Sequence, residues 1–523
     1  MNAKGIAKAI IVITTVSAAV MELVDTSIVN VAISDMAGSL GVSIEDISWV
    51  ITSYAIANVI IIPLTGFLAQ YFGRKNYYLV SMIIFTLSSY MCAQSTSLVE
   101  IILWRFIQGI GGGALLSTSQ SILFDAFDEK DRPIAAGLFG MGLVLGPTLG
   151  PTIGGLIIEH FSWPLIFLIN VPIGFVATIL TYTFIDKKPG EGKNKSSIHI
   201  DYTGILLLMA GIGCLQYVLE RGQSEDWFSS NYIRVCSVIA FLGLAGFITY
   251  ELSIKNPAVN LRLLGERNLA FTTVFTFVAG VGLFTSVFVY PVLAQRVLGW
   301  SAYETGLSLL APTLIGAIMM PIIGRSMSKG LSAVPLIVTG FLLFAAYSWL
   351  TANMSTDVGK WNFFFPLALR SFGISMVMLP LINQAVAGLA PKDYASGISL
   401  NNMIRQLGGA FGIAMANNYI SNNYAQHRYD MVSKLTEGSA QLTERLNNIS
   451  HNMIAKSGTD SATAATQAYT MISNAVDRQA YYLSYLDTFR LITIFFILVI
   501  PLVVFLKTKK QPPEAAAAAL EAH

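Results

Sequence analysis

A run of glycines and prolines inside an apolar segment constrains this chain more than any other feature. In the run GLVLGPTLGPTIGG, glycines recur at four-residue intervals with prolines between them: Gly142, Gly146, Pro147, Gly150, Pro151, Gly154 and Gly155. Glycines at that spacing share one face of a helix, where a second backbone can approach closely. Glycine and proline destabilise water-exposed helices, but neighbouring helices in a membrane re-satisfy the backbone groups that they free. The run therefore predicts a closely packed, bent membrane helix.

The composition supports a membrane protein throughout. Of 523 residues, 54% are hydrophobic and only 12% are charged, and the mean hydropathy is +0.62. The net charge of +2 gives no reason to expect a nucleic-acid partner. Three dispersed cysteines, five scattered histidines and the lack of a nucleotide-binding motif predict no metal site, no cofactor and no catalysis.

The chain contains fourteen segments that are long and apolar enough to cross a bilayer. They cover about residues 7–33, 46–69, 77–95, 98–123, 133–158, 164–185, 202–219, 232–253, 268–294, 303–324, 332–351, 361–388, 395–418 and 487–506. If the N-terminus is cytoplasmic, more than half of the 32 Lys and Arg residues fall in cytoplasmic loops, as the positive-inside rule requires. We therefore expect both termini in the cytoplasm.

The chain also repeats itself weakly. Arg105 with Gln120 resembles Arg370 with Gln384, and a Pro-to-Gly segment precedes a basic turn in each half. The repeat predicts an all-α fold of two six-helix bundles with an inserted helix pair, an arrangement typical of transporters. The expected domains are a first bundle at 1–190, a linker with the inserted pair at 191–262, helices nine to thirteen at 263–420, an extracytoplasmic helical loop at 421–486, and the last span with a cytoplasmic tail at 487–523.

Ionisable residues inside the predicted spans are the first candidates for function, because they are costly in a membrane. Glu22 and Asp25 lie three residues apart on the first span, and Arg105 lies within the fourth. Two carboxylates so close together are suited to taking up and releasing protons, and a nearby arginine could set when they do so. Alternatively, these groups could serve only as polar contacts between helices. Arg370, Arg405 and Arg490 lie in spans of the second half without acids close in sequence.

A tight basic turn after the second span suggests a gate at the cytoplasmic surface. Its residues are Gly66, Gly73, Arg74 and Lys75, and Asp125 at the end of the fourth span could pair with it in one conformation only. The turn could equally be an ordinary positive-inside anchor. Polar residues within spans are candidates for a substrate pocket: Asn30, Gln120, Gln384 and Arg405.

Several segments resemble the motifs of a known family. GFLAQYFGRK, LWRFIQGIGGG, LVDTSIVNVAI and the glycine-proline run resemble, in order and position, motifs of the major facilitator superfamily, and the run looks like its antiporter motif. The fourteen predicted spans, WPLIFLINVPIG and LERGQSEDWFSS look like drug:proton antiporters of the EmrB/QacA type, with the EmrB branch the closer match.

The resemblance implies a pump in the bacterial inner membrane that exports hydrophobic or amphipathic compounds in exchange for protons by alternating access. It also implies that Asp25 and Arg105 take part in coupling, that the glycine-proline helix is a contact between the two bundles, and that a periplasmic adaptor and an outer-membrane channel are partners. Two positions depart from the family pattern: Gln70 replaces the usual acid of the basic turn, and the thirteenth span has no carboxylate. Proton-coupled uptake of a small nutrient is the alternative function.

Overall fold

Helices make up every regular element in the computed structural model, which describes residues 3–186, 201–255, 257–355, 359–390, 393–435, 439–457 and 460–505. Two features expected from the sequence lie outside these residues: the cytoplasmic tail beyond residue 505 and the start of the linker up to residue 200. Each predicted span coincides with a long helix, because the apolar runs that fit the bilayer are also the runs that form unbroken helices.

The long helices of the first half are α1 (Ala3–Leu40), α3 (Trp49–Phe72), α4 (Arg74–Gln94), α5 (Leu98–Ala126), α6 (Arg132–His160) and α8 (Asn170–Phe184). Those of the second half are α11 (Arg267–Arg296), α12 (Ala302–Ser328), α13 (Ala333–Thr351), α14 (Phe364–Gln384), α15 (Tyr394–Val432) and α17 (Ser461–Val499). Between them come α9 (Tyr202–Arg221) and α10 (Asn231–Ser253). The shorter elements are α2 (Ile44–Ile47), α7 (Leu165–Leu168), α16 (Ala440–Ser457) and the 3-10 turns η1 (Glu129–Asp131), η3 (Trp227–Ser229), η4 (Leu261–Gly265), η5 (Lys360–Phe363) and η7 (Ile500–Phe505).

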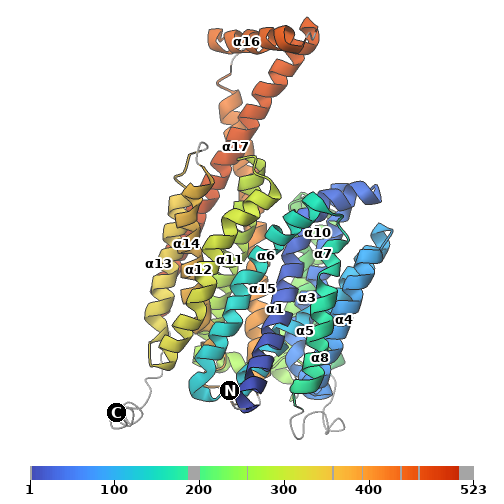
Figure 1. The fold of residues 1–523 in the computed structure, drawn as a ribbon, viewed down its shortest axis with the longest axis vertical. Coiled ribbons are helices and arrows are strands. Elements are labelled where there is room, and N and C mark those ends of the chain that lie inside the picture. The colour runs from blue at the N-terminus through green and yellow to red at the C-terminus, as the bar shows by residue number, and fades with distance from the viewer. Residues whose placement is uncertain are drawn as a thin grey trace.

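Twelve helices of the described residues are long and apolar enough to cross a membrane. Helices α4 and α15 occupy predicted spans without being among those twelve. Both run alongside the other long helices in Figure 1, with α4 packed on α5 and α8, and α15 packed on α11 and α3. The all-α, two-bundle architecture is thus confirmed.

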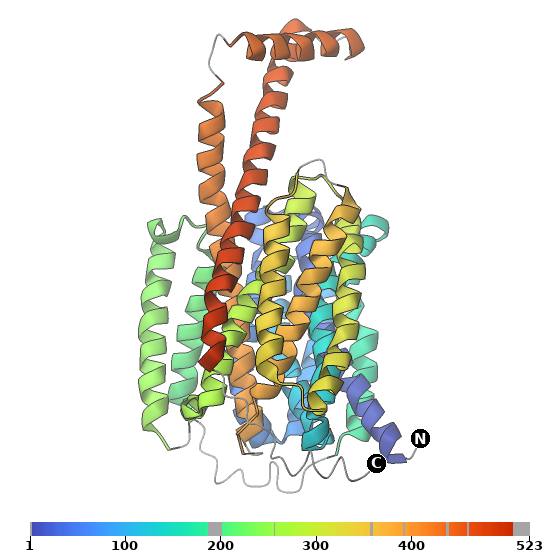
Figure 2. The ribbon, with the colours of Figure 1, turned by 90° about the vertical axis from the view of Figure 1, so that its left-hand side faces the viewer.

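The inserted pair stands at the edge of the molecule. Helix α9 packs against α3 and α10 packs against α9, and Figure 2 shows both at the left-hand edge. Large apolar side chains are exposed along α10, among them Phe241 and Leu242. Such a surface suits contact with lipid acyl chains.

Helices α15 and α17 continue far beyond the bundle, side by side, and α16 lies across their tip (Figure 2). We call the described part of residues 421–486 the extension. Tyr424 and Tyr481 stack with ring centroids 4.0 Å apart, and Arg428 Nε donates to Asp477 Oδ1 at 2.7 Å. The segment is helical as predicted, and the two helices pass without a break through residues 420 and 486.

The glycine-proline run lies in α6, which is one continuous helix that includes Pro147 and Pro151. The expectation that this helix is a contact between the bundles agrees with the packing of α6 on α12, but Gly142, Gly146, Gly150 and Gly154 face α1. A Cβ at Gly142 would lie 2.9 Å from Val20 of α1, and one at Gly154 would lie 2.8 Å from Ile28 of α1. These glycines therefore let α6 approach α1 within the same bundle.

Contact between the bundles uses Gly155 of the run and residues of α6 outside the run. A Cβ at Gly137 would lie 2.8 Å from the carbonyl oxygen of Met320 in α12, and one at Gly155 would lie 2.8 Å from the backbone nitrogen of Tyr303. Helix α6 therefore packs between α1 of its own bundle and α12 of the other. The four-residue spacing correctly predicted a close helix contact, but it did not specify which helix is the partner.

Candidate functional site

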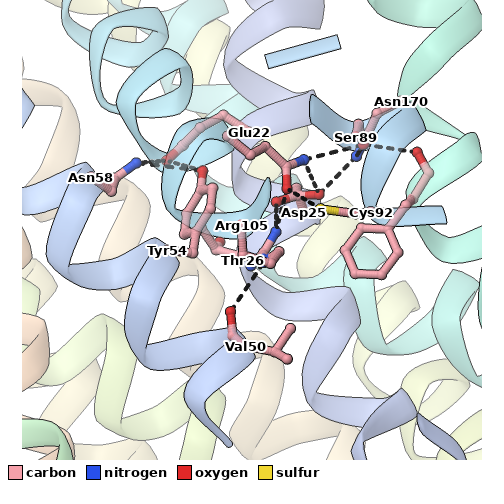
Figure 3. Close-up of polar contacts among 12 residues, drawn as sticks. Glu22, Asp25, Thr26, Val50, Tyr54, Asn58, Ser89, Cys92, Arg105 and Asn170 are labelled. Carbon is pink, nitrogen blue, oxygen red and sulfur yellow. Dashed lines mark hydrogen bonds and ion pairs between the residues drawn. The ribbon is translucent and has the colours of Figure 1, made fainter. Parts of the chain in front are cut away.

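Asp25 and Arg105 form an ion pair in the centre of the first bundle (Figure 3). The side chains are 0% and 1% exposed, and Arg105 Nη1 donates to Asp25 Oδ2 at 2.6 Å. The second carboxylate oxygen, Oδ1, accepts from Gln108 Nε2 at 3.0 Å and from Asn170 Nδ2 at 2.8 Å. Four helices of the first bundle thus meet at Asp25: α1 bears it, and α5 and α8 supply its donors. Helix α4 contributes Ser89, whose hydroxyl accepts from the same Gln108 and Asn170 amides.

The guanidinium of Arg105 is held on several sides. Its Nε donates to the carbonyl oxygen of Val50 at 3.1 Å, Nη1 also donates to Gln108 Oε1 at 2.8 Å, and Cζ lies 4.2 Å from the centroid of the Tyr54 ring. A buried charge is tolerated when a counter-charge and further hydrogen bonds surround it. Asp25 and Arg105 therefore form a mutually neutralised unit whose separation would leave two buried charges.

Glu22 belongs to a different set of contacts, although it lies on the same helix. Its Oε1 accepts from Asn58 Nδ2 at 3.0 Å and from the Tyr54 hydroxyl at 3.4 Å, whereas its buried Oε2 has no hydrogen-bond partner. The cation that interacts with it electrostatically is Arg405 of α15, in the other bundle. Glu22 thus faces the contact between the bundles, while Asp25 is enclosed within one of them.

A set of buried amides continues this polar region across the bundle contact. Asn402 Nδ2 of α15 donates to Ser117 Oγ at 3.1 Å and to Gln120 Oε1 at 3.3 Å, both on α5. Unused hydrogen-bonding atoms gather here: Glu22 Oε2, Asn58 Oδ1, Gln120 Nε2 and Arg405 Nε. We call Glu22, Asn58, Gln120, Asn402 and Arg405 the interface polar cluster. Of these, the Glu22 carboxylate oxygen can accept a proton, and all four atoms can form hydrogen bonds with water or with a polar ligand group.

Sequence reasoning found part of this cluster. Of the four predicted pocket residues, Gln120 and Arg405 are buried within it, whereas Asn30 is exposed and Gln384 is half-buried at the end of α14. Asn58 and Asn402 were missed, although a lone amide inside an apolar span is itself a signal.

The expectation that Arg490 lacks a nearby acid is wrong, since its Nη1 donates to Asp487 Oδ1 at 2.9 Å one turn away. Asp487 Oδ2 also lies 2.7 Å from His427 Nε2, where the extension leaves the bundle.

The predicted gate residues come together at the end of the bundle opposite the extension, which we call the basic end. Arg74 and Asp125 form an ion pair, and Lys75 Nζ donates to the carbonyl oxygen of Tyr182 at 2.7 Å. Gly73 adopts a φ of 81°, a value that favours glycine, and so permits the sharp turn between α3 and α4.

At the same end, the two bundles are in contact. A Cβ at Gly66 would lie 2.9 Å from Ser396 Cα of α15, and Arg132 Nη1 of α6 donates to the Tyr394 hydroxyl at 2.9 Å. The bundles are therefore held together at the basic end by both backbone packing and a hydrogen bond.

We expect Arg74→Glu to lower the population of this conformation about fivefold, because a pair this exposed contributes on the order of 1 kcal/mol to it. The reversed pair, Arg74→Glu with Asp125→Arg, should recover most of the loss. Lys329→Glu, another basic position at the same end, serves as the control for charge alone. Equal loss in the single and the reversed variants would contradict a conformational role for the pair.

Residues 15–413 match the family model described as Major Facilitator Superfamily. The chain belongs to this superfamily. It is 34% identical to the multidrug export protein EmrB of Escherichia coli strain K12 over 83% of this chain and 82% of that protein. It is also 30% identical to the fatty acid resistance protein FarB of Neisseria gonorrhoeae over 96% of each chain.

A solved structure agrees with the fold. The human organic anion transporter MFSD10 (TETRAN) superposes with a TM-score of 0.56 at 14% identity, covering 95% of this chain and 100% of that one. Together with the apolar helices, the family and its multidrug-export relatives identify this chain as a multi-pass membrane transporter of the EmrB-like type.

Proposed function

We propose that this protein is a proton-coupled antiporter that exports hydrophobic or amphipathic drugs and other toxic compounds across the bacterial inner membrane by alternating access. The names of two relatives support the substrate class, since one is a multidrug export protein and the other a fatty acid resistance protein, and fatty acids are amphipathic. Glu22, Asp25 and Arg105 carry the coupling in this proposal, with Asp25 as the residue on which it depends most.

The observation that supports coupling most strongly is the different setting of the two acids on α1. Asp25 is neutralised by Arg105, while Glu22 has one unpartnered oxygen and faces Arg405 of the other bundle. Protonation of Glu22 would remove its attraction for Arg405 and so loosen the bundle contact at that point. Movement of α1 would then separate Asp25 from Arg105, and the freed carboxylate would take up the proton.

Helix α6 is suited to transmit this movement. One side of it packs on α1 through the glycine run, and another packs on α12 of the second bundle. A rotation of one bundle against the other through the α6 and α12 contact would therefore move α1 as well. We therefore propose that α6 couples the movement of the two bundles to the movement of the acids on α1 during exchange.

Proton flux in everted membrane vesicles tests the function directly. With an imposed proton gradient, we expect hydrophobic weak acids or lipophilic cations to release protons, and sugars to release none. Vesicles without the protein are the control. If every hydrophobic compound leaves the gradient unchanged while a sugar or amino acid collapses it, the exporter is excluded in favour of nutrient uptake.

For orientation, we propose that the basic end and both termini are cytoplasmic, so that the extension lies in the periplasm. The distribution of Lys and Arg along the chain supports this direction. A single cysteine at residue 429 should react with an impermeant maleimide in intact spheroplasts, and a single cysteine at residue 329 should react only after the membrane is opened.

The extension is the proposed docking site for a periplasmic adaptor of the membrane fusion type, which would lead to an outer-membrane channel. Exposed aromatic residues on its helices, Tyr429 at 71% and Tyr469 at 63%, support such a contact. We expect a photo-crosslinking residue at 429 or 469 to capture the adaptor in cells, whereas the same residue at 241 on lipid-facing α10 should not. Capture of the transporter alone at all three positions would exclude this docking site.

A further inference from the structure

Arg370 is the counterpart in the second half of Arg105 in the first, yet no acid among the residues that the structure describes pairs with it. The repeat aligns the two arginines on α14 and α5, and both are buried, at 3% and 1% exposure. In the first half, α1 supplies Asp25 to neutralise Arg105. The corresponding helix of the second half, α11, contains no Asp or Glu between its first residue and its last.

The groups around Arg370 are hydroxyls with unused donors. Its Nε and Nη1 have no hydrogen-bond partner, and neither do the Tyr347 hydroxyl and Ser371 Oγ. The titratable groups that interact with it are two tyrosines, Tyr290 of α11 and Tyr347 of α13, and the Tyr347 hydroxyl lies near the guanidinium without forming a well-aligned hydrogen bond. Tyr290 shares a hydrogen bond with Ser308 Oγ at 2.9 Å. Within the part of the chain that the structure describes, the surroundings therefore offer several hydrogen-bond donors and no negative charge.

This arrangement differs from that of the other buried arginines in the spans. Arg105 bonds to Asp25, and Arg405 has Glu22 as its electrostatic partner across the bundle contact. A guanidinium stays protonated in any protein environment, so Arg370 cannot avoid the free-energy cost of burial by losing its charge. An unpaired buried charge costs several kcal/mol, and a ligand of opposite charge relieves that cost.

We propose that Arg370, with the Tyr347 hydroxyl and Ser371, is a subsite for a singly charged anionic group. Guanidinium and hydroxyl donors match a carboxylate, which accepts two hydrogen bonds from Arg, and they also match a halide ion. The two sources of that charge are the carboxylate of an amphipathic substrate and chloride from the medium. The substrate source rests on the proposed export function, whereas chloride binding does not.

The position of α14 links this subsite to the contact between the bundles. Helix α14 packs against α11, α12 and α13 of its own bundle and also against α6 of the first. Ser371 contacts α12 at Gly316, where an added Cβ would lie 2.8 Å from the serine Cβ. A rearrangement of the contact between α6 and the second bundle would therefore change the surroundings of this subsite as well.

Thermal unfolding of the purified protein in a neutral detergent tests binding without transport. In a medium whose only anion is isethionate, added chloride or salicylate should raise Tm in proportion to the logarithm of its concentration. Salicylamide, the uncharged analogue, should give no shift. A shift with chloride alone identifies a halide ion as the occupant, and a shift with salicylate alone identifies a substrate carboxylate; both support the anion subsite.

The variants separate a specific site from general salt effects. Arg370→Gln should abolish the shift, Arg370→Lys should retain a smaller one, and Arg490→Gln, which removes a half-exposed paired arginine, should keep the full shift. In isethionate, Arg370→Met should unfold at or above the temperature of the unchanged protein, because it removes an uncompensated charge. No shift with either anion, or an equal shift in Arg370→Gln, overturns the proposal.

Transport then distinguishes this subsite from the proposed function. Arg370→Lys should raise KM about tenfold for export of a lipophilic carboxylate if one bidentate charged contact is lost. Its KM for a lipophilic cation should be unchanged. If neither compound is exported by the unchanged protein, the proposed function fails, while the binding result in detergent stands by itself.

Discussion

Asp25→Asn is expected to abolish proton-coupled flux, the largest loss among the changes considered. Asparagine cannot carry the proton, and it also leaves the buried guanidinium of Arg105 without its counter-charge. Breaking a buried ion pair by removing one partner costs about 3–5 kcal/mol, so stability should fall together with transport. The measurement is dye-reported proton flux in everted vesicles, normalised to the amount of inserted protein.

Loss of stability and loss of coupling can be separated with a second change. Asp25→Asn with Arg105→Gln removes both charges and should recover much of the thermal stability, because no unpaired charge is left. Coupled flux should stay absent in this double variant. Glu22→Gln is the matched single change on the same helix, and we expect it to weaken coupling while leaving the Asp25 and Arg105 pair in place. Normal flux in Asp25→Asn would show that Asp25 is not required to carry the proton and would assign that role to Glu22.

The positions of the spans could be predicted from the sequence because the bilayer imposes one length on every helix that crosses it. The same rule could not predict how far α15 and α17 extend beyond the other helices. Polar helices in water are held by contacts between side chains distant in sequence, such as Tyr424 with Tyr481 and Arg428 with Asp477. The sequence therefore predicted a helical segment here, but not a projecting pair with α16 across its tip.

The candidate site divides in a similar way. That Asp25 and Arg105 lie inside spans follows from the sequence. Because a buried unpaired charge is costly in a membrane, an ion pair between them lowers the free energy of both. That Gln108 and Asn170 complete the contact depends on how α5 and α8 are rotated against α1, which no local pattern specifies. Periodicity defines a face of a helix and leaves its partner open, so the sequence did not show that four glycines of the run face α1 while Gly155 faces α12.

Gly150→Ala is expected to lower transport about tenfold through the contact between α6 and α1, since overpacking a tight helix contact costs about 1–3 kcal/mol. The added methyl group would overlap Ser27 Oγ and lie 2.8 Å from the backbone nitrogen of Ile28, so α1 must move away from α6. Ser27 is two residues from Asp25, and such a movement would stretch the 2.6 Å bond to Arg105.

Two further variants decide whether the effect of Gly150→Ala comes from the contact between α6 and α1. Gly38→Ala places the same methyl group on α1 where nothing lies within 4 Å, and it should transport normally. Ser27→Gly combined with Gly150→Ala removes the side chain that the methyl group meets, leaving only the approach to Ile28, and should restore part of the flux. If Gly150→Ala instead behaves like Gly38→Ala, then the spacing between α1 and α6 does not govern coupling. Partial recovery in the double variant would show that the glycine run acts by holding α1, and with it both acids, against the helix that meets the second bundle.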